Sequence, residues 1–156
     1  MKVKTFLQYK HQQQAYKIFK SYPNLFTKAE LKILREDLKT GDNKSHFKFV
    51  AVDKEQVVGF ISLATCYATD YSWQVNWLAV HPDFQRLGVG RLLINFLFQK
   101  AKKLGLKRLF VETCSCQGEK PARLFYQKHG FKKIARLPDF YARKHSKVIY
   151  LKNIVE

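Results

Sequence analysis

Gln85-Arg86-Leu87-Gly88-Val89-Gly90-Arg91, termed the glycine loop below, joins a strand-like segment to a long amphipathic helix. Before it, residues 74–80 are β-branched and aromatic enough for a largely buried strand, which His81-Pro82 ends. After it, apolar residues follow the helical period of 3.6 as far as Gly105. These are Val89, Leu92, Leu93, Phe96, Leu97, Ala101 and Leu104. The order of strand, loop and helix predicts an α/β arrangement.

The glycine loop has the properties of a phosphate-binding site. Glycines at a helix start let a ligand approach the backbone, and the unpaired N–H groups and dipole of the first turn favour an anion. A Rossmann fingerprint would need a third glycine at Leu93, and no Gly-Lys-Ser/Thr of a Walker motif follows. A helix merely opened by glycine fits the spacing equally well.

Length and composition predict one domain over residues 1–156. The chain is 46% hydrophobic, which excludes a mostly disordered protein, and its length is that of one ordinary domain. No apolar run approaches the roughly 18 residues of a membrane span. The start Met1-Lys2-Val3-Lys4 lacks the apolar core of a signal peptide, so we expect a cytoplasmic protein without membrane contact.

The formal charge of +17 comes from 29 basic and 12 acidic residues, and only five acidic residues lie in 81–156. Such a field attracts a polyphosphate ligand, but also any nucleic acid. The lysines are scattered singly, and no RNP or zinc-finger pattern is present, so a solvated surface accounts for most of them. We therefore expect nucleic-acid binding to be weak and non-specific at most.

Three cysteines are present, and Cys114-Ser115-Cys116 has the spacing of neither a zinc ribbon nor a CxxC motif. We therefore expect reduced structural thiols and no metal site.

The hydrophobic patterns predict seven strands and four helices. Strands are expected at 3–7, 47–52, 57–64, 73–80, 108–113, 131–137 and 147–153, and helices at 11–21, 27–41, 88–105 and 121–128. The crossover rule makes the strand at 108–113 parallel to that at 73–80. A loop containing Asp139, Phe140 and Tyr141 is expected between the last two strands. The fold class is thus α/β (α+β), with a mixed, mostly antiparallel sheet and a central parallel pair.

Two motifs resemble those of the GNAT superfamily of N-acetyltransferases. Gln85, Gly88 and Gly90 match its acetyl-CoA motif, Gln/Arg-x-x-Gly-x-Gly/Ala. Its downstream helix reads Asn-x-x-Ala-x-x-aromatic/Leu-Tyr-x-x-x-Gly-Phe. This chain supplies Ala122, Phe125, Tyr126, Gly130 and Phe131 in that register, with Glu119 where asparagine is usual. The resemblance covers nearly the whole chain and implies a GNAT-like domain with acetyl-CoA as cosubstrate and no metal.

The resemblance also implies a cofactor site and a proton donor. The implied cofactor-binding residues are Leu78, Ala79, Val80, Arg86, Leu87, Gly88, Val89, Gly90, Arg91, Glu119 and Tyr126. In this family the parallel strands splay, so the backbone of 78–80 would bind the pantetheine arm and polarise the thioester carbonyl. Tyr126 would protonate the leaving thiolate. A core residue with no catalytic role is the alternative for Tyr126.

Two routes are open for the general base. Many relatives carry a glutamate where this chain has Gln74, beside Asn76, and neither amide accepts a proton usefully. Glu112 corresponds to the strand glutamate that serves as base in the branch acetylating protein N-termini. A structural ion pair is an equally good role for Glu112, and a chain of water molecules to bulk solvent is the other route.

The predicted function is direct transfer of an acetyl group from acetyl-CoA to a primary amine of a small molecule or a protein N-terminus, by a monomer or homodimer. The basic composition argues against cationic aminoglycosides and polyamines. By analogy, the first helices and residues 139–141 would form the acceptor pocket. The alternative is a basic nucleic-acid-binding module with a vestigial acyl-CoA site.

Overall fold

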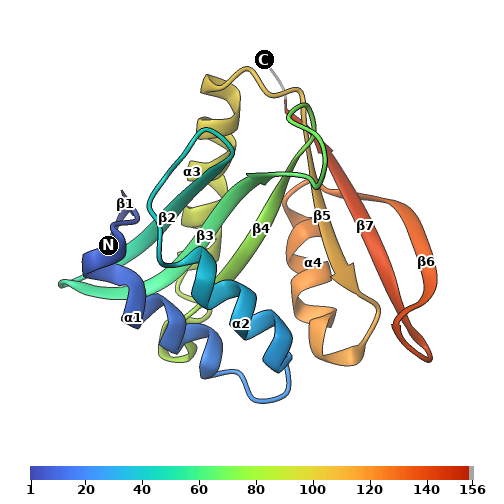
Figure 1. Cartoon of the computed structure of the whole chain (residues 1–156), viewed down its shortest axis with the longest axis horizontal. Coiled ribbons are helices and arrows are strands. Elements are labelled where there is room, and N and C mark those ends of the chain that lie inside the picture. The colour runs from blue at the N-terminus through green and yellow to red at the C-terminus, as the bar shows by residue number, and fades with distance from the viewer. Residues whose placement is uncertain (155–156) are drawn as a thin grey trace.

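The structure is a computed structural model that describes residues 1–154. Its centre is a seven-stranded sheet in the order β1-β2-β3-β4-β5-β7-β6 (Figure 1). The strands are β1 (Lys2–Thr5), β2 (His46–Asp53), β3 (Gln56–Thr65), β4 (Trp73–Val80), β5 (Arg108–Cys114), β6 (Lys132–Ala142) and β7 (His145–Asn153). The α-helices are α1 (Gln8–Lys20), α2 (Lys28–Asp37), α3 (Val89–Lys103) and α4 (Lys120–Lys128). The predicted order of elements is confirmed.

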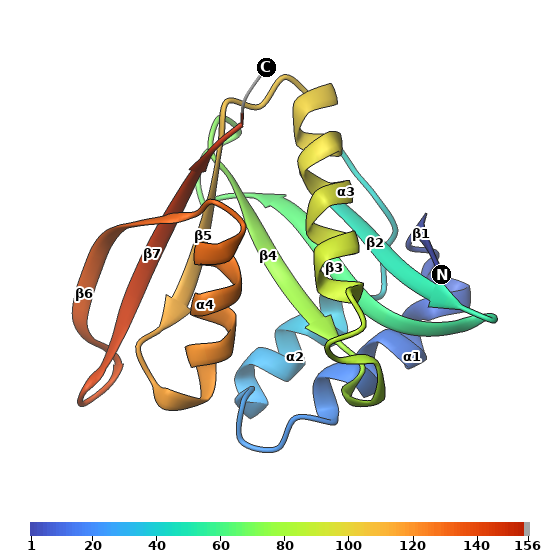
Figure 2. The same ribbon diagram turned by 180° about the vertical axis from the view of Figure 1, so that it is seen from behind.

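Helices cover both faces of the sheet. Figure 1 shows α1 and α2 in front of it, and the view from behind shows α3 and α4 on the other side (Figure 2). One core therefore lies under α3 and α4, and includes Leu93, Leu97 and Val111. A second core lies under α1 and α2, and includes Phe19, Leu34 and Phe60. Within residues 1–154, the helices are too short or too polar to serve as membrane spans.

Hydrogen bonds between side chains and backbone mark the starts of the first two helices. The Thr27 hydroxyl accepts the N–H of Glu30 at 3.0 Å, so the capping box predicted at the start of α2 is confirmed. Helix α1 begins at Gln8, three residues earlier than expected. There the N–H of Leu7 donates to Nδ1 of His11 at 3.0 Å. The imidazole of His11 thus accepts a backbone hydrogen bond in the first turn of α1. The sequence pattern predicted His11 as the first helical residue and gave no role to its side chain.

The central parallel pair is short and then diverges. Strands β4 and β5 pair only at Trp73 with Leu109 and at Gln74 with Phe110. On the other side of β4, Val75 pairs with Leu63 and Trp77 with Ser62, which leaves Asn76 as a bulge. A bulge bends its strand and increases the local twist. The carboxyl end of β4 thus separates from β5, as Figure 1 shows, and opens a gap between them.

The predicted loop at Asp139, Phe140 and Tyr141 is wrong, because β6 continues to Ala142. Leu137 pairs with Lys147 and Ala142 pairs with His145, so residues 138–141 bulge out of the ladder between two paired positions. Asp139 adopts a left-handed φ of 51°, and its carboxylate accepts the N–H of Lys144 at 2.8 Å. Pro138 and Asp139 suggested a connection between strands, but they lie within an irregular strand of a long hairpin.

Candidate active site

The glycine loop presents free backbone donors at the start of α3. Gly88 is the N-cap residue with a left-handed φ of 83°, and no side chain caps the helix. The first helical bond of this end runs from the N–H of Leu92 to the carbonyl of Gly88 at 2.9 Å. Within the described chain, the N–H groups of residues 89–91 have no acceptor. Three N–H groups at the positive end of a helix dipole suit a pyrophosphate.

The second glycine of the motif has a packing role. A Cβ built on Gly90 would lie 3.1 Å from Cε2 of Phe125 on α4 and 3.8 Å from Cγ2 of Val80 on β4. The missing side chain therefore allows α3 to approach α4 at the point where β4 ends. Gly90 thus brings the two motif helices together, in addition to leaving its own N–H free.

Only part of the predicted strand segment faces the gap. The N–H of His81 donates to the carbonyl of Val58 at 2.8 Å, and Ala79 pairs with Phe60 two residues earlier. Hydrogen-bonded pairs alternate along an antiparallel ladder, so the backbone groups of Ala79 point to β3. Those of Leu78 and Val80 point away from β3, toward the gap. Of residues 78–80, these two are therefore placed to meet a ligand through their backbone.

Tyr22, which follows α1, was not singled out from the sequence. Its hydroxyl donates to the carbonyl of Val80 and accepts from Nε2 of Gln85 at 2.6 Å. Burial raises the pKa of Tyr22. This side chain links the first residue of the glycine loop to the end of β4. No motif or periodicity could have identified it, because the three residues meet only through the fold.

Tyr126 is buried on α4, with 6% of its surface exposed. Its ring packs edge-on against Phe131, with centroids 5.4 Å apart, and its hydroxyl has no hydrogen-bond partner within residues 1–154. Burial, followed by repulsion from Glu119, raises the pKa of Tyr126. The phenol therefore keeps its proton near neutral pH, as a proton donor must, but it is a weaker acid than a free tyrosine.

Glu112 forms an ion pair. Nζ of Lys147 lies 3.1 Å from Oε2 of Glu112, and the two side chains are 13% and 46% exposed. The ammonium of Lys147 also lies 3.8 Å from the ring centroid of Phe140, a cation–π contact. The structural role predicted as one alternative for Glu112 is therefore present. A catalytic role of the same carboxylate would have to operate beside this cation.

Tyr141, on the β6–β7 hairpin, lies in a field of negative charge. Burial raises the pKa of Tyr141, and the negative charges of Glu112, Glu119 and Glu30 add to the shift. Burial also raises the pKa values of Glu30 and Glu119. Three carboxylates that are distant in sequence thus contribute to the negative field at one tyrosine.

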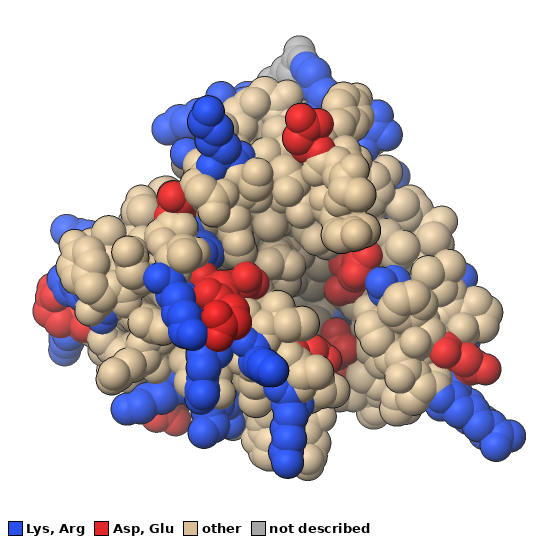
Figure 3. Space-filling view, in the orientation of Figure 1, with Lys and Arg blue, Asp and Glu red and all other residues tan. Residues whose placement is uncertain are grey.

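The surface shows the same gathering of negative charge. Figure 3 shows a hollow near the middle of this face, over the region where β4 and β5 diverge, with acidic side chains at its border. Lysine and arginine side chains project around this region, and some of them lie directly beside the acidic side chains. A net charge of +17 therefore coexists with a locally acidic hollow.

A family model described as an acetyltransferase (GNAT) domain matches residues 44–133, more than half of the chain. The chain belongs to the GNAT acetyltransferase family, and this assignment favours the acetyltransferase interpretation over the nucleic-acid-binding alternative.

Two sequence relatives have defined activities. The chain is 30% identical over 94 residues to an amino-acid acetyltransferase of Pasteurella multocida (strain Pm70). The matched segment is 59% of this chain but only 20% of that relative, so this chain spans about a fifth of the relative's length. It is 26% identical over 106 residues to the [ribosomal protein bS18]-alanine N-acetyltransferase of Haemophilus influenzae (strain ATCC 51907 / DSM 11121 / KW20 / Rd), covering 68% of each chain.

Two solved structures share the fold. A Desulfovibrio desulfuricans protein assigned to the GNAT family superimposes with a TM-score of 0.89 at 24% identity, covering 99% of both chains. An aminoglycoside 6'-N-acetyltransferase complexed with coenzyme A gives a TM-score of 0.81 at 18% identity, covering 100% of this chain and 98% of the other. The expectation of a GNAT-like fold is thereby confirmed.

Proposed function

We propose that this protein transfers an acetyl group from acetyl-CoA directly to a primary amine. The observation that carries the proposal is the set of unbonded N–H groups of residues 89–91, which lies beyond the carboxyl end of β4 where β4 and β5 diverge. The pyrophosphate of the cofactor would bind these groups, together with Arg86, Leu87 and Gly88. The pantetheine arm would then follow the backbone of Leu78 and Val80 into the gap.

The reaction needs one bond made and one broken. The amine nitrogen attacks the thioester carbonyl carbon, the carbon–sulfur bond breaks, and the coenzyme leaves as a thiolate. The N–H groups of Leu78 and Val80 are placed to stabilise the negative charge that develops on the carbonyl oxygen. Tyr126 gives its proton to the thiolate and is reprotonated from solvent. Its unpartnered hydroxyl supports this assignment, and its raised pKa keeps the proton on the phenol until the thiolate forms, although it also makes the transfer less favourable.

The attacking amine must also lose a proton. Glu112 is the proposed acceptor of that proton, directly or through water. The ammonium of Lys147 lies 3.1 Å from Oε2 of Glu112, so this carboxylate would have to accept the proton while it is paired with a cation. A water chain to bulk solvent is the competing route, and the two are separated by the paired variants described in the Discussion.

For the acceptor, we propose a primary amine that enters as a cation. The ammonium form would be attracted to the hollow that has acidic side chains at its border (Figure 3). The argument from the basic composition is therefore weaker than it was from the sequence alone, because Glu112 and Glu119, two of the five acidic residues in 81–156, both add negative charge at Tyr141. Polyamines, aminoglycosides and amino-terminal peptides thus belong in one panel of acceptors.

The test is an acetyl-CoA-dependent thiol-release assay across that panel, with free amino acids and acidic amines as the contrasting classes. We expect thiol release that depends on the amine and yields the N-acetylated product by mass spectrometry. A cation should be used with higher kcat/KM than a neutral amine of similar size. If no amine class accelerates thiol release and acetyl-CoA produces no thermal shift, the proposed function is wrong.

A further inference from the structure

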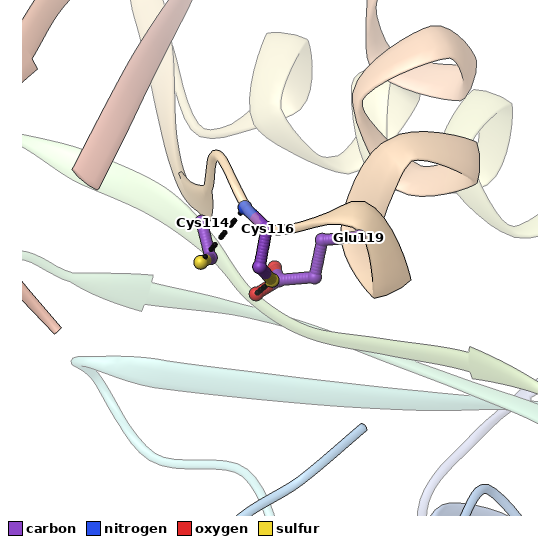
Figure 4. Close-up of side chains that lie close together, drawn as sticks. All are labelled: Cys114, Cys116 and Glu119. Carbon is purple, nitrogen blue, oxygen red and sulfur yellow. Dashed lines mark hydrogen bonds between the residues drawn. The ribbon is translucent and has the colours of Figure 1, made fainter. Parts of the chain in front are cut away.

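The connection between β5 and α4 brings together two thiols and a carboxylate. Sγ of Cys114, Sγ of Cys116 and a carboxylate oxygen of Glu119 all lie within 4.8 Å of one another (Figure 4). Sγ of Cys116 is 3.7 Å from Oε2 of Glu119. The N–H of Cys116 donates to Sγ of Cys114 at 3.0 Å, which holds the two cysteines side by side.

Neighbouring contacts hold this connection in place. The guanidinium of Arg123 donates to the carbonyl of Cys116 at 2.8 Å and also to that of Cys114. Ser115 is tied to β7 by two bonds of 2.8 Å, one from its N–H to the carbonyl of Ser146 and one from the N–H of Ser146 to its hydroxyl. The three ligand-bearing side chains therefore start from a fixed backbone, which lowers the cost of ordering a site.

We propose that Cys114, Cys116 and Glu119 form a site for one thiophilic divalent cation, of which Zn²⁺ is the representative. Zinc binds thiolate sulfur at about 2.3 Å and carboxylate oxygen at about 2.0–2.2 Å. In a tetrahedron of that size, ligand atoms lie roughly 3.5–3.8 Å apart. The separation of 3.7 Å between Cys116 and Glu119 already matches this edge.

The composition of the site determines its character. As each metal–sulfur bond forms, the thiol releases its proton to solvent, so the ion is bound by two thiolates and one carboxylate. Three protein ligands leave the fourth tetrahedral position for water or a small ligand. The spacing of the two cysteines pointed away from a metal because the third ligand comes from the 3₁₀ turn (Gln117–Glu119) that leads into α4. This inference does not depend on the acetyltransferase activity.

The experiment uses the full chain, reduced and without a polyhistidine tag. The affinity and stoichiometry of Zn²⁺ binding are measured by competition with a chromogenic chelator. Cd²⁺ is titrated separately, because its bond to a thiolate gives a charge-transfer absorption band. We expect one equivalent per chain, with the band saturating at that point. Second-sphere changes cost about 10- to 100-fold in metal affinity, so loss of a ligand in Cys116→Ser or Glu119→Gln should cost at least tenfold.

The third cysteine provides the matched control. Cys66 is a free thiol outside the cluster, so Cys66→Ser should keep full affinity and the charge-transfer band. Cys114 is buried, and both Cys114→Ser and Cys114→Ala are therefore compared, each checked by a thermal melt. Absence of stoichiometric binding, or binding that survives Cys116→Ser in a folded protein, overturns the proposal. Loss of binding in Cys66→Ser also overturns it.

Discussion

Nζ of Lys147 lies 3.1 Å from Oε2 of Glu112, so the candidate base is already paired with a cation. The pair joins β7 to β5, and the ring of Phe140 covers the ammonium from one side. Two roles of Glu112, structural and catalytic, therefore involve the same oxygen atoms. Variants that remove one partner at a time separate them.

Glu112→Gln should lower kcat by about 10²-fold or more if the carboxylate takes the proton of the amine. Lys147→Met keeps the carboxylate and should change kcat by less than about tenfold. Neither change should cost more than about 1 kcal/mol of stability, because the pair is partly exposed. The measurements are steady-state kinetics with the best amine and urea unfolding. Equal, small effects of both variants would assign Glu112 to the ion pair alone.

Tyr126→Phe should reduce kcat by roughly 10²- to 10⁴-fold, with KM for acetyl-CoA little changed. The hydroxyl has no hydrogen-bond partner in the described chain, so stability should change little. Tyr150→Phe is the matched control, because Tyr150 is also buried but its hydroxyl accepts from Gln127. Kinetics across pH and a thermal melt check both variants. Wild-type kcat in Tyr126→Phe, with chemistry rate-limiting, would show that the tyrosine only packs.

Gly88→Ala should weaken acetyl-CoA binding by about tenfold or more, because the change strains the backbone that presents the N–H groups. Gly105 follows the carboxyl end of α3 and serves as the control, because it also has a left-handed φ, of 74°, and no atom lies within 4 Å of a Cβ added there. Both alanine variants should lose about 1–2 kcal/mol of stability from left-handed strain. Only Gly88→Ala should reduce the calorimetric affinity for acetyl-CoA. A similar loss in Gly105→Ala would indicate a global effect.

Acid should destabilise the protein through His46. Burial, and then the charge of Lys48, lowers the pKa of His46 to about 4 from an ordinary value near 6.5. Between these two values the unfolded state binds more protons than the folded state, so stability falls as pH decreases through this window. The loss at pH 5 should be roughly 1–2 kcal/mol.

The measurement for His46 is urea unfolding at pH 7.5 and pH 5.0. His46→Asn should show a smaller difference between the two conditions than the wild type. The same substitution at the exposed His145 is the control for the loss of an imidazole elsewhere. Equal pH dependence of wild type and His46→Asn would contradict the assignment.

Lys48→Met should destabilise the protein by about 3 kcal/mol. Lys48 is fully buried, and its ammonium donates to the carbonyls of Asp37 at 2.6 Å and Thr40 at 2.8 Å, at the end of α2. Methionine fills the volume but leaves these acceptors without a donor. Urea unfolding measures the loss, and exposed Lys44→Met is the control, expected within about 0.5 kcal/mol of wild type.

Local patterns were sufficient to predict the order of elements. Period-2 and period-3.6 hydrophobicity identified the strands and helices, and glycines and caps located most of their ends. The two motifs, at 85–90 and 119–131, predicted the family because each is a short contiguous stretch whose backbone geometry depends on its own residues. The parallel pairing of β4 and β5 followed from the handedness of the crossover.

The contacts between distant segments depended on the tertiary structure alone. Alternation in β2 placed Lys48 on the opposite side from Phe47 and Phe49, but it could not show that α2 would bury that side. In the same way, Tyr22 meets Val80, and Lys147 meets Glu112, only because the sheet order brings their elements together. Hydrophobic patterning specifies which face of an element is buried, whereas the partners of polar groups depend on which elements become neighbours. The acidic hollow arises from those neighbours, although the net charge of the chain suggested a basic surface. The cluster of Cys114, Cys116 and Glu119 forms within one connection, but only the turn at 117–119 shows that the carboxylate comes back to the two thiols.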